Sequence, residues 1–363
     1  MQVNRSSARK VEIEAERGLP GSMLGPSANS RTGSTVCLLA YAPLGRYASR
    51  MLDRVKRGLR SHEEERLQRE LDEAHATIKR LRRHLKEAES DPFPADKLVW
   101  IFGMGRSGSS WLAFMLREVP RGNTIWQEPW TSVCLGPVAG QEEGIERLRI
   151  REQTIFGSPF EEVWFASVRR MVLEGAAARF PRVGERSYLI VKEPNGSSAA
   201  PVLVKALPES EVIFLVRDPR DVAASMLDSV RPGGWREGRP GTRGPDDVIV
   251  SNSARTYVKN MDGAKRGFEA HRGPKVLVRY EDLRADALGE LRRIYSELGL
   301  SASEEELARA VEKHAWENIP ETKKGPGRSR RKAVPGSWRE DLTQEQARRV
   351  EEITAPLLEE FYP

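Results

Sequence analysis

LVWIFGMGRSGSSW, residues 98–111, is the stretch that decides the fold. Its apolar first half predicts a buried strand, and a turn with Gly103, Gly105 and Gly108 leads into an amphipathic segment that begins at Ser109. A strand that enters a helix through glycines exposes backbone N–H groups at the positive end of the helix dipole. This stretch therefore predicts a cradle for a phosphate group.

The cradle differs from the loop that binds nucleoside triphosphates. That loop has the pattern G-x-x-x-x-G-K-[ST], and here Gly103 and Gly108 keep the spacing while Ser109 stands where the Lys is required. Arg106 is the cation of the turn. A tight strand-to-helix turn without a ligand is the alternative, and the motifs further along the chain decide between the two.

The chain has 363 residues, a length that suffices for one large α/β domain or two smaller ones. Its formal net charge is +6. Residues 1–90 hold 18 Lys and Arg against 12 Asp and Glu, and the rest of the chain holds 41 of each. Because the excess of positive charge precedes the first strand, a nucleic-acid-binding face on the folded domain is not expected. Cys37 and Cys134 provide neither a disulfide framework nor a zinc-binding spacing.

Apolar segments near the N-terminus are short. The longest, residues 35–44, contains Pro43 and is too short to span a bilayer. It also follows too much polar sequence to be a signal peptide. We therefore expect a soluble, cytoplasmic protein without a transmembrane segment.

The sequence before the domain divides into two parts. Residues 1–50 are rich in Ser, Gly, Arg and Pro and are expected to be disordered. A helical segment is expected over residues 51–91, and residues 61–90 carry an apolar heptad seam, namely Leu67, Leu71, Ala74, Ile78, Leu81 and Leu85. The seam fits either a helix packed on the domain or a short coiled coil that joins two chains in a homodimer. The folded domain is expected over residues 97–363.

Three further apolar runs predict buried strands. Each ends in a polar motif: KEP at 192–194, RDPRD at 217–221 and YEDL at 280–283. Since ligands of open α/β sheets bind at the carboxyl ends of the strands, the three motifs indicate one site. The order of strands and helices predicts an α/β fold with a doubly wound parallel sheet of the P-loop type.

Together the motifs resemble those of sulfotransferases that use 3′-phosphoadenosine 5′-phosphosulfate (PAPS) as the sulfuryl donor. The GxxRSGSS loop is similar to the 5′-phosphosulfate loop of the carbohydrate-directed branch. Arg217 and Ser225 have the spacing of the family's 3′-phosphate element. Near the C-terminus, residues 331–338 (RKAVPGSW) resemble the family's R-K-G-x-x-G-x-W loop, with Ala333 in place of the first Gly.

The resemblance covers residues 97 to about 360 and implies a set of donor-binding residues. These are Gly105, Arg106, Ser107, Gly108, Ser109, Ser110, Trp111, Arg217, Ser225, Tyr280, Arg331 and Lys332. Tyr280 is expected beside the adenosine of the donor. No metal is expected, because fixed cations hold the leaving group and no Mg-binding Ser or Thr follows a P-loop Lys.

Three catalytic side chains are also implied by the resemblance. Glu128, in a Glu-Pro pair after the first helix, is similar in position to the catalytic Glu of carbohydrate and tyrosylprotein sulfotransferases and would accept the acceptor's proton. Glu193 is the reserve candidate for this base. Arg106 and Lys192, the latter in a segment similar to the Lys-Asp-Pro of tyrosylprotein sulfotransferases, would stabilise charge on the transferred group.

The acceptor is expected to be a carbohydrate hydroxyl, although lipid, peptide and small-alcohol acceptors use the same donor machinery. Residues 231–247, rich in Gly, Pro and Arg, suit an acceptor-binding loop or mobile lid, or else a disordered insertion. Trp126, Trp130 and Trp235 could stack on sugar rings or belong to the core. Two other classes stay open: a nucleotide kinase, and a catalytically silent nucleotide-binding protein dimerised by its coiled coil.

Overall fold

The computed structural model describes residues 68–79, 91–129, 131, 135, 160–184, 186–239 and 243–363. The chain divides into two units, residues 1–89 and 90–363. In the first unit residues 68–79 form a helix on which Leu71 and Ile78, one heptad apart, are half-buried. Ala74, which lies between them on the seam, is exposed. The expected disorder of residues 1–50 and the other seam residues, Leu67, Leu81 and Leu85, lie outside the described residues. The coiled coil and the homodimer therefore stay predictions.

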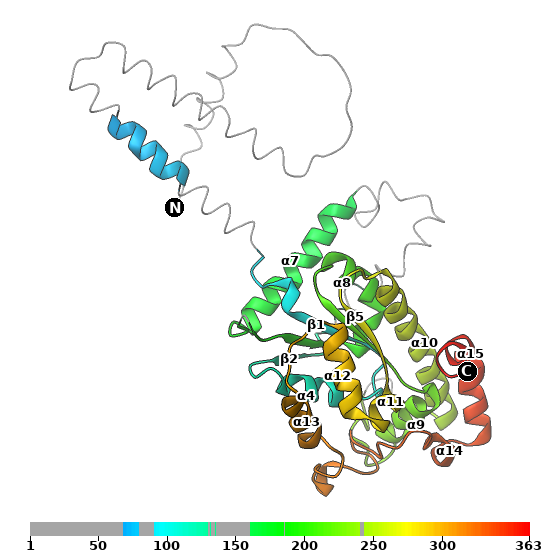
Figure 1. The fold of residues 1–363 in the computed structure, drawn as a ribbon. Coiled ribbons are helices and arrows are strands. Elements are labelled where there is room, and N and C mark those ends of the chain that lie inside the picture. The colour runs from blue at the N-terminus through cyan, green and yellow to red at the C-terminus, as the bar shows by residue number, and fades with distance from the viewer. Residues whose placement is uncertain are drawn as a thin grey trace, which may run out of the picture. The chain divides into compact units, whose positions relative to one another are not determined.

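A five-stranded parallel sheet runs through residues 90–363 (Figure 1). Its strands, in the order β2-β3-β1-β4-β5, are β2 (Thr124–Gln127), β3 (Leu189–Lys192), β1 (Leu98–Gly103), β4 (Glu211–Val216) and β5 (Lys275–Arg279). All neighbouring pairs are parallel, so their carboxyl ends meet at one edge of the sheet. The polar motifs predicted from the sequence follow these ends.

Alternate residues of β1 face opposite sides of the sheet. Trp100 and Phe102 belong to one apolar cluster, and Val99 and Ile101 belong to another. Every residue of β1 is buried. A strand buried on both faces has no need of polar residues at alternate positions, which explains why this stretch of sequence is continuously apolar.

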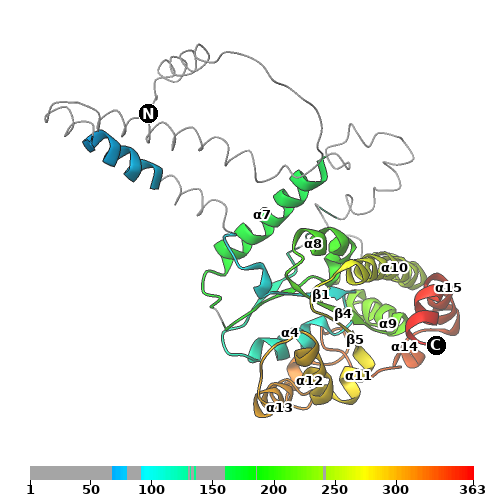
Figure 2. The same cartoon turned by 45° about the horizontal axis from the view of Figure 1, so that its top comes forward.

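Helices cover both faces of the sheet (Figures 1 and 2). The face with Trp100 packs against α7 (Glu161–Arg179), α8 (Ala200–Ala206) and α10 (Asp246–Ala270). The opposite face packs against α4 (Ser109–Glu118), α12 (Ala287–Glu297) and α13 (Glu304–Lys313). The doubly wound parallel sheet predicted from the sequence is confirmed.

The remaining helices lie around the carboxyl ends of the strands and along the C-terminal part of the chain. They are η3 (Pro194–Ala199), α9 (Pro219–Val230), α11 (Tyr280–Ala285), α14 (Trp338–Asp341), α15 (Gln344–Phe361) and the short η4 (Glu321–Lys323). A further short helix, η1 (Ala95–Lys97), directly precedes β1 at the amino end of that strand. Asp218 caps α9, because its side chain accepts the N–H of Arg220 over 2.8 Å. This cap and Pro219 at the first turn start the helix directly after Arg217 leaves the sheet.

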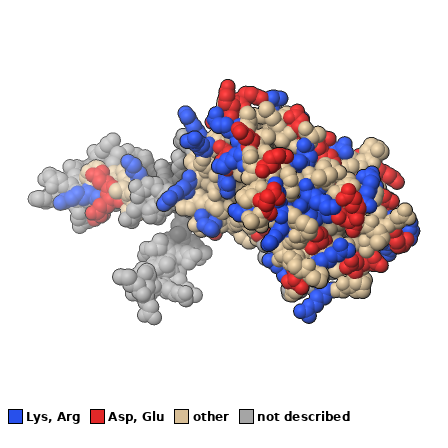
Figure 3. All heavy atoms as spheres, turned by 90° about the horizontal axis from the view of Figure 1, so that it is seen from below, with Lys and Arg blue, Asp and Glu red and all other residues tan. Residues whose placement is uncertain are grey.

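Basic and acidic side chains are interspersed on the face shown in Figure 3. This distribution agrees with the equal numbers of basic and acidic residues after residue 90. Among the described residues, no helix combines the length and the apolar character needed to cross a bilayer.

Candidate active site

The loop between β1 and α4 is tightly bent. Arg106 (φ 75°) and Gly108 (φ 89°) both adopt left-handed backbone conformations. A Cβ atom on Gly108 would lie 2.5 Å from Cδ2 of Tyr280, and one on Gly105 would lie 2.6 Å from Oδ1 of Asn195. Both glycines are needed because neighbouring side chains fill the space that a Cβ would take.

Arg106 connects the two predicted donor-binding motifs. Its Nε donates to Oγ of Ser225 over 3.0 Å, and its carbonyl oxygen accepts from Nη1 of Arg217 over 2.9 Å. Its Nη2 donates to the carbonyl oxygen of Ser329 over 2.9 Å. Burial, together with the nearby charges of Arg217 and Arg331, lowers the pKa of Arg106 to about 10. Guanidinium groups crowded in this way indicate a site for an anion.

Buried polar groups without partners occur at the same place. Among the described residues, Oγ of Ser107 and Nε of Arg217 have no hydrogen-bond partner. Buried polar groups in folded proteins are normally paired. The first N–H groups of α4, at Ser109 and Ser110, add donors that a helix leaves free at its start. These donors fit the phosphate groups of an adenosine bisphosphate.

Tyr280 is buried between the loop and Arg217. The centroid of its ring lies 4.2 Å from Cζ of Arg217 and 6.3 Å from that of Trp111, in an edge-on arrangement. Nε1 of Trp111 donates to the carbonyl oxygen of His314 over 2.9 Å. Tyr280, at the start of α11, therefore packs against the loop, with Trp111 of α4 beside it. The contact of these two residues with the adenosine stays a prediction.

The C-terminal loop adopts the bend that the family's pattern requires, despite its substitution. Ala333 has φ 55°, the left-handed conformation for which glycine is favoured. Arg331 forms an ion pair with Asp341 and donates to Oγ of Ser337 over 3.1 Å. Nζ of Lys332 lies 2.9 Å from Oδ1 of Asp341. Both cations predicted to bind phosphate are thus held by a carboxylate, and their role toward the donor stays a prediction.

The predicted base and the second predicted cation lie together. Gln127 pairs in register with Lys192, and the N–H of Glu128 donates to the carbonyl oxygen of Lys192 over 2.8 Å. Glu128 and Lys192 therefore leave neighbouring strands at the same edge, and their side chains form an ion pair. Glu128 has φ 47°, a left-handed conformation that costs about 1–2 kcal/mol in a non-glycine residue. Strain of this kind is concentrated at functional sites.

Asn195 is a site residue that the sequence reasoning missed. It follows the KEP motif in η3, and its Nδ2 donates to Oε2 of Glu128 over 2.9 Å. Its amide also lies directly against Gly105. Asn195 therefore connects the carboxylate to the donor loop. Its position, a polar residue immediately after a motif at a strand end, was the signal available in the sequence.

Glu193, the reserve candidate for the base, is in a different environment. It is 0% exposed, and its carboxylate lies beneath Gly196, whose Cβ would be 1.9 Å from Oε1. The side chain of Glu128 is 26% exposed. A base must reach the proton of a bound acceptor, so the geometry favours Glu128 over Glu193.

The three tryptophans considered for sugar stacking differ in their surroundings. The ring of Trp126 is half-buried and packs on Phe180, with 5.7 Å between centroids, against the core. Trp130 lies outside the described residues. Trp235 is 42% exposed, close to Arg106. Only Trp235, of the two that the structure describes, offers a ring to an acceptor.

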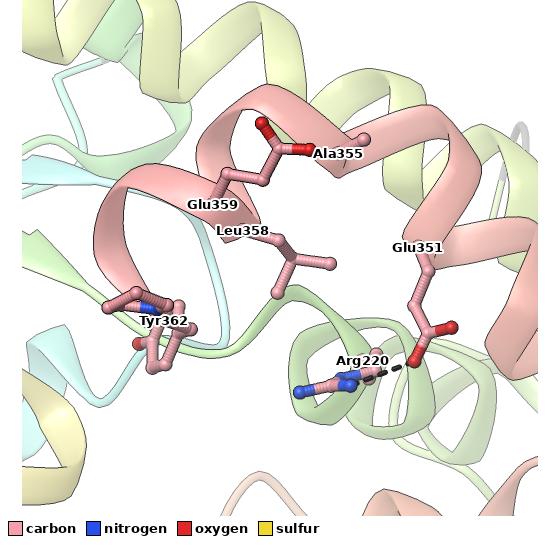
Figure 4. A pocket seen from close by; sticks show the side chains of 7 residues that line it. Arg220, Glu351, Ala355, Leu358, Glu359 and Tyr362 are labelled. Carbon is pink, nitrogen blue, oxygen red and sulfur yellow. Dashed lines mark hydrogen bonds and ion pairs between the residues drawn. The ribbon is translucent and has the colours of Figure 1, made fainter.

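A separate hollow of about 340 Å³ lies on α15 (Figure 4). It is lined by Arg220, Glu351, Ala355, Leu358, Glu359, Tyr362 and Pro363. Arg220 is already paired with Asp218 and Glu351, each over 2.8 Å. None of the predicted site residues lines this hollow, so it does not enter the candidate active site.

A model of the sulfotransferase family matches residues 99–304, which include the donor loop, Glu128, Lys192 and Arg217. The chain belongs to the sulfotransferase family. The resemblance drawn from the sequence motifs is therefore confirmed at the level of the family.

Two curated sulfotransferases resemble parts of this family member. The omega-hydroxy-beta-dihydromenaquinone-9 sulfotransferase Stf3 of Mycobacterium bovis is 32% identical over 148 residues, which are 38% of this chain and 34% of Stf3. Human carbohydrate sulfotransferase 6 is 29% identical over 199 residues, 48% of this chain and 47% of that protein. The chain thus spans between about a third and a half of the length of these relatives. A solved structure, sulfotransferase STF9 from Mycobacterium avium, is 16% identical with a TM-score of 0.47, covering 93% of this chain and 98% of STF9.

Proposed function

We propose that this protein is a PAPS-dependent sulfotransferase that transfers a sulfuryl group to an acceptor hydroxyl. The observation that carries the proposal is the ion pair between Glu128 and Lys192, which Asn195 links to the donor loop. A carboxylate next to a phosphate-binding loop is positioned to act as the base that removes the proton of an acceptor hydroxyl. Membership in the sulfotransferase family supports the same reaction.

The donor site is formed by the residues at the start of α4 and around Arg217. The backbone N–H groups of Ser109 and Ser110 would hold the 5′-phosphosulfate, and Arg217 with Ser225 would hold the 3′-phosphate. The partnerless Oγ of Ser107 and Nε of Arg217 support this assignment. When bound, PAPS supplies the sulfuryl group that is transferred.

The catalytic roles follow from the contacts of each side chain. Glu128 accepts the proton of the acceptor hydroxyl on its carboxylate, which Lys192 and Asn195 orient. The ammonium of Lys192 has three N–H groups, so donors beyond the one on Glu128 can stabilise charge on the transferred group. Arg106 supplies a second cation there. Each such donor contributes about 3 kcal/mol to lowering the barrier.

A carbohydrate hydroxyl is our first choice of acceptor, supported by the similarity to human carbohydrate sulfotransferase 6. A hydroxylated lipid is the second, supported by the similarity to Stf3, which is named for a hydroxylated menaquinone. A cytoplasmic location is also part of the proposal.

The donor is tested by thermal unfolding with adenosine 3′,5′-bisphosphate (PAP), ADP or ATP at equal concentrations. A ligand at a hundred times its dissociation constant adds about 2.7 kcal/mol to the free energy of unfolding. Selective stabilisation by PAP is expected. Stabilisation by ATP alone would instead support the nucleotide kinase, and no stabilisation by any of the three would contradict a donor site.

The base is tested by Glu128→Gln, assayed with PAPS and a panel of carbohydrate and lipid alcohols. A fall in kcat of about 10²–10⁴-fold is expected, with PAP binding retained. Glu162→Gln, at an exposed carboxylate on α7, is the control and should be as active as the wild type. PAP binding without sulfuryl transfer to any acceptor in the wild type would favour the catalytically silent binding protein.

A further inference from the structure

Residues 231–239 present an exposed aromatic ring surrounded by guanidinium groups. Three arginine side chains surround the ring of Trp235. The distance from Cζ to the centroid of the ring is 5.1 Å for Arg239, 5.7 Å for Arg106 and 5.8 Å for Arg236. We call these four residues the Trp235 cluster. Because Arg106 belongs to the donor loop, the cluster lies next to the proposed donor site.

The Trp235 cluster is held in place by backbone hydrogen bonds. The N–H of Trp235 donates to the carbonyl oxygen of Gly327 over 3.0 Å, and that of Arg236 donates to the carbonyl oxygen of Ser229 over 2.9 Å. The N–H of Gly327 in turn donates to Oδ2 of Asp228 over 2.9 Å. Residues 231–239 are therefore tied to the end of α9 and to the segment before the C-terminal loop. These hydrogen bonds give residues 231–239 a defined conformation, which is not that of a disordered insertion.

The charge of Arg236 has no anionic partner among the described residues. Its guanidinium is half-buried and donates from Nη1 to Sδ of Met226 over 2.7 Å. A thioether is a weak acceptor that carries no charge. Burial and the neighbouring Arg239 lower the pKa of Arg236, and Glu128 acts in the opposite direction. Arg236 is thus within electrostatic range of the proposed base, and its charge is poorly compensated.

Nearby carboxylates already have other partners. Asp228 accepts the N–H of Gly327, and Glu237 accepts the N–H of Gly233 over 2.9 Å. Glu128 is held by the ion pair and the amide hydrogen bond described above. A ligand is therefore the available source of negative charge for Arg236.

We propose that the acceptor carries an anionic group, a carboxylate, phosphate or sulfate, close to the hydroxyl that is sulfated, and that Arg236 and Trp235 bind this part of the acceptor. The inference rests on the proposed function, since Glu128 marks the reacting hydroxyl. A guanidinium matches the oxygens of such groups in two parallel hydrogen bonds. The exposed indole provides a flat apolar surface for the adjoining part of the acceptor. The donor's own phosphates are assigned to Arg217, Ser225 and the α4 N–H groups.

The test measures binding to the protein saturated with PAP, so that anions cannot occupy the donor site. Calorimetric titrations compare two matched pairs: a hyaluronan tetrasaccharide with its carboxyl-reduced neutral form, and 3-hydroxydodecanoate with dodecane-1,3-diol. We expect the anionic member of one pair to bind about tenfold more tightly than its neutral counterpart, given the strength of hydrogen bonds to charged groups. The pair that shows the preference identifies a carbohydrate or a lipid acceptor.

Arg236→Gln should abolish this preference while leaving stabilisation by PAP intact. Arg292→Gln is the matched control, because Arg292 is an exposed arginine on α12 that is already paired with Glu304. Equal binding within both pairs, no binding of either anionic compound, or a preference that survives Arg236→Gln would overturn the inference. If PAP did not stabilise the wild type, the proposed function itself would be overturned. Failure of the inference and failure of the proposed function are therefore distinguishable.

Discussion

The side-chain amide of Asn195 donates a 2.9 Å hydrogen bond to one carboxylate oxygen of Glu128, while Lys192 holds the other oxygen. Both partners are therefore needed to fix the orientation of the carboxylate. The same amide lies against Gly105 of the donor loop. A side chain that contacts both the proposed base and the proposed donor site couples the position of one to the other.

Asn195→Ala is expected to lower kcat by about ten- to a hundredfold and to change the KM for PAPS by less than about threefold. The reason is that a base misplaced by as little as 1 Å loses about a hundredfold in rate, while the phosphate contacts of the donor are retained. Steady-state kinetics with varied PAPS separates kcat from KM. Asn195→Asp, which cannot donate to Glu128 and adds a negative charge, should be slower still. A change confined to the KM for PAPS would show that Asn195 acts only on the donor loop.

Gly108→Ala is expected to weaken PAP binding more than tenfold. The new Cβ would lie 2.5 Å from Cδ2 of Tyr280, so the loop must move away from its present path. Gly299→Ala is the control, because Gly299 has a similar positive φ of 68° and nothing within 4 Å of the added Cβ. Calorimetric titration with PAP should find an unchanged dissociation constant in Gly299→Ala. Equal affinities of the two variants would contradict the role of Gly108 in shaping the cradle.

The elements that the sequence predicts well carry their signal locally. Residues 98–103 and 212–216 are uniformly apolar because both strands are buried on both faces, and the predicted strand ends match the structure closely. β2 gives a weaker signal because it is an edge strand with no fully buried residue. The meeting of Glu128 with Lys192 depends on the neighbouring positions of β2 and β3 in the sheet, which no local pattern encodes.

Other parts of the site could not be predicted because they arise from tertiary contacts. The hydrogen bond between Arg106 and Ser225 joins residues 119 positions apart. Asn195 has no signature of its own beyond its place after the KEP motif. The guanidinium groups around Trp235 come from the donor loop as well as from residues 231–239. Composition alone allowed either an acceptor-binding loop or a disordered insertion there.

Ala333→Gly is expected to raise the free energy of unfolding by about 0.5–1 kcal/mol. The left-handed conformation of Ala333 costs about 1–2 kcal/mol, and the greater freedom of glycine in the unfolded chain offsets part of the gain. For a domain of this size the melting temperature should rise by about 2 °C. Ala315→Gly, at a half-buried position outside helices and without a positive φ, should lower it. A lower melting temperature in Ala333→Gly would contradict the strain assigned to this loop.

Glu211, the first residue of β4, lies at the opposite end of this strand from Arg217. It is 7% exposed, and its Oε2 has no hydrogen-bond partner among the described residues. Burial raises the pKa of Glu211 from its ordinary 4.5 to about 8. Between these two values the folded protein holds a proton that the unfolded chain has released. The contribution of Glu211 to stability is therefore fully present below about pH 4.5 and is lost as the pH rises through about 8.

Glu211→Gln, which stays neutral at every pH, should remove this loss. We expect the free energy of unfolding of the variant to exceed that of the wild type at pH 9 by more than about 1 kcal/mol, since one pKa unit corresponds to about 1.4 kcal/mol. Denaturant unfolding from pH 5 to 9 measures the difference, which should grow as the pH rises. Glu162→Gln, at an exposed carboxylate, should follow the wild-type curve throughout. If the curves of Glu211→Gln and the wild type were parallel, Glu211 would be ionised in the folded protein, and the strand end would need a cation or water to stabilise that charge.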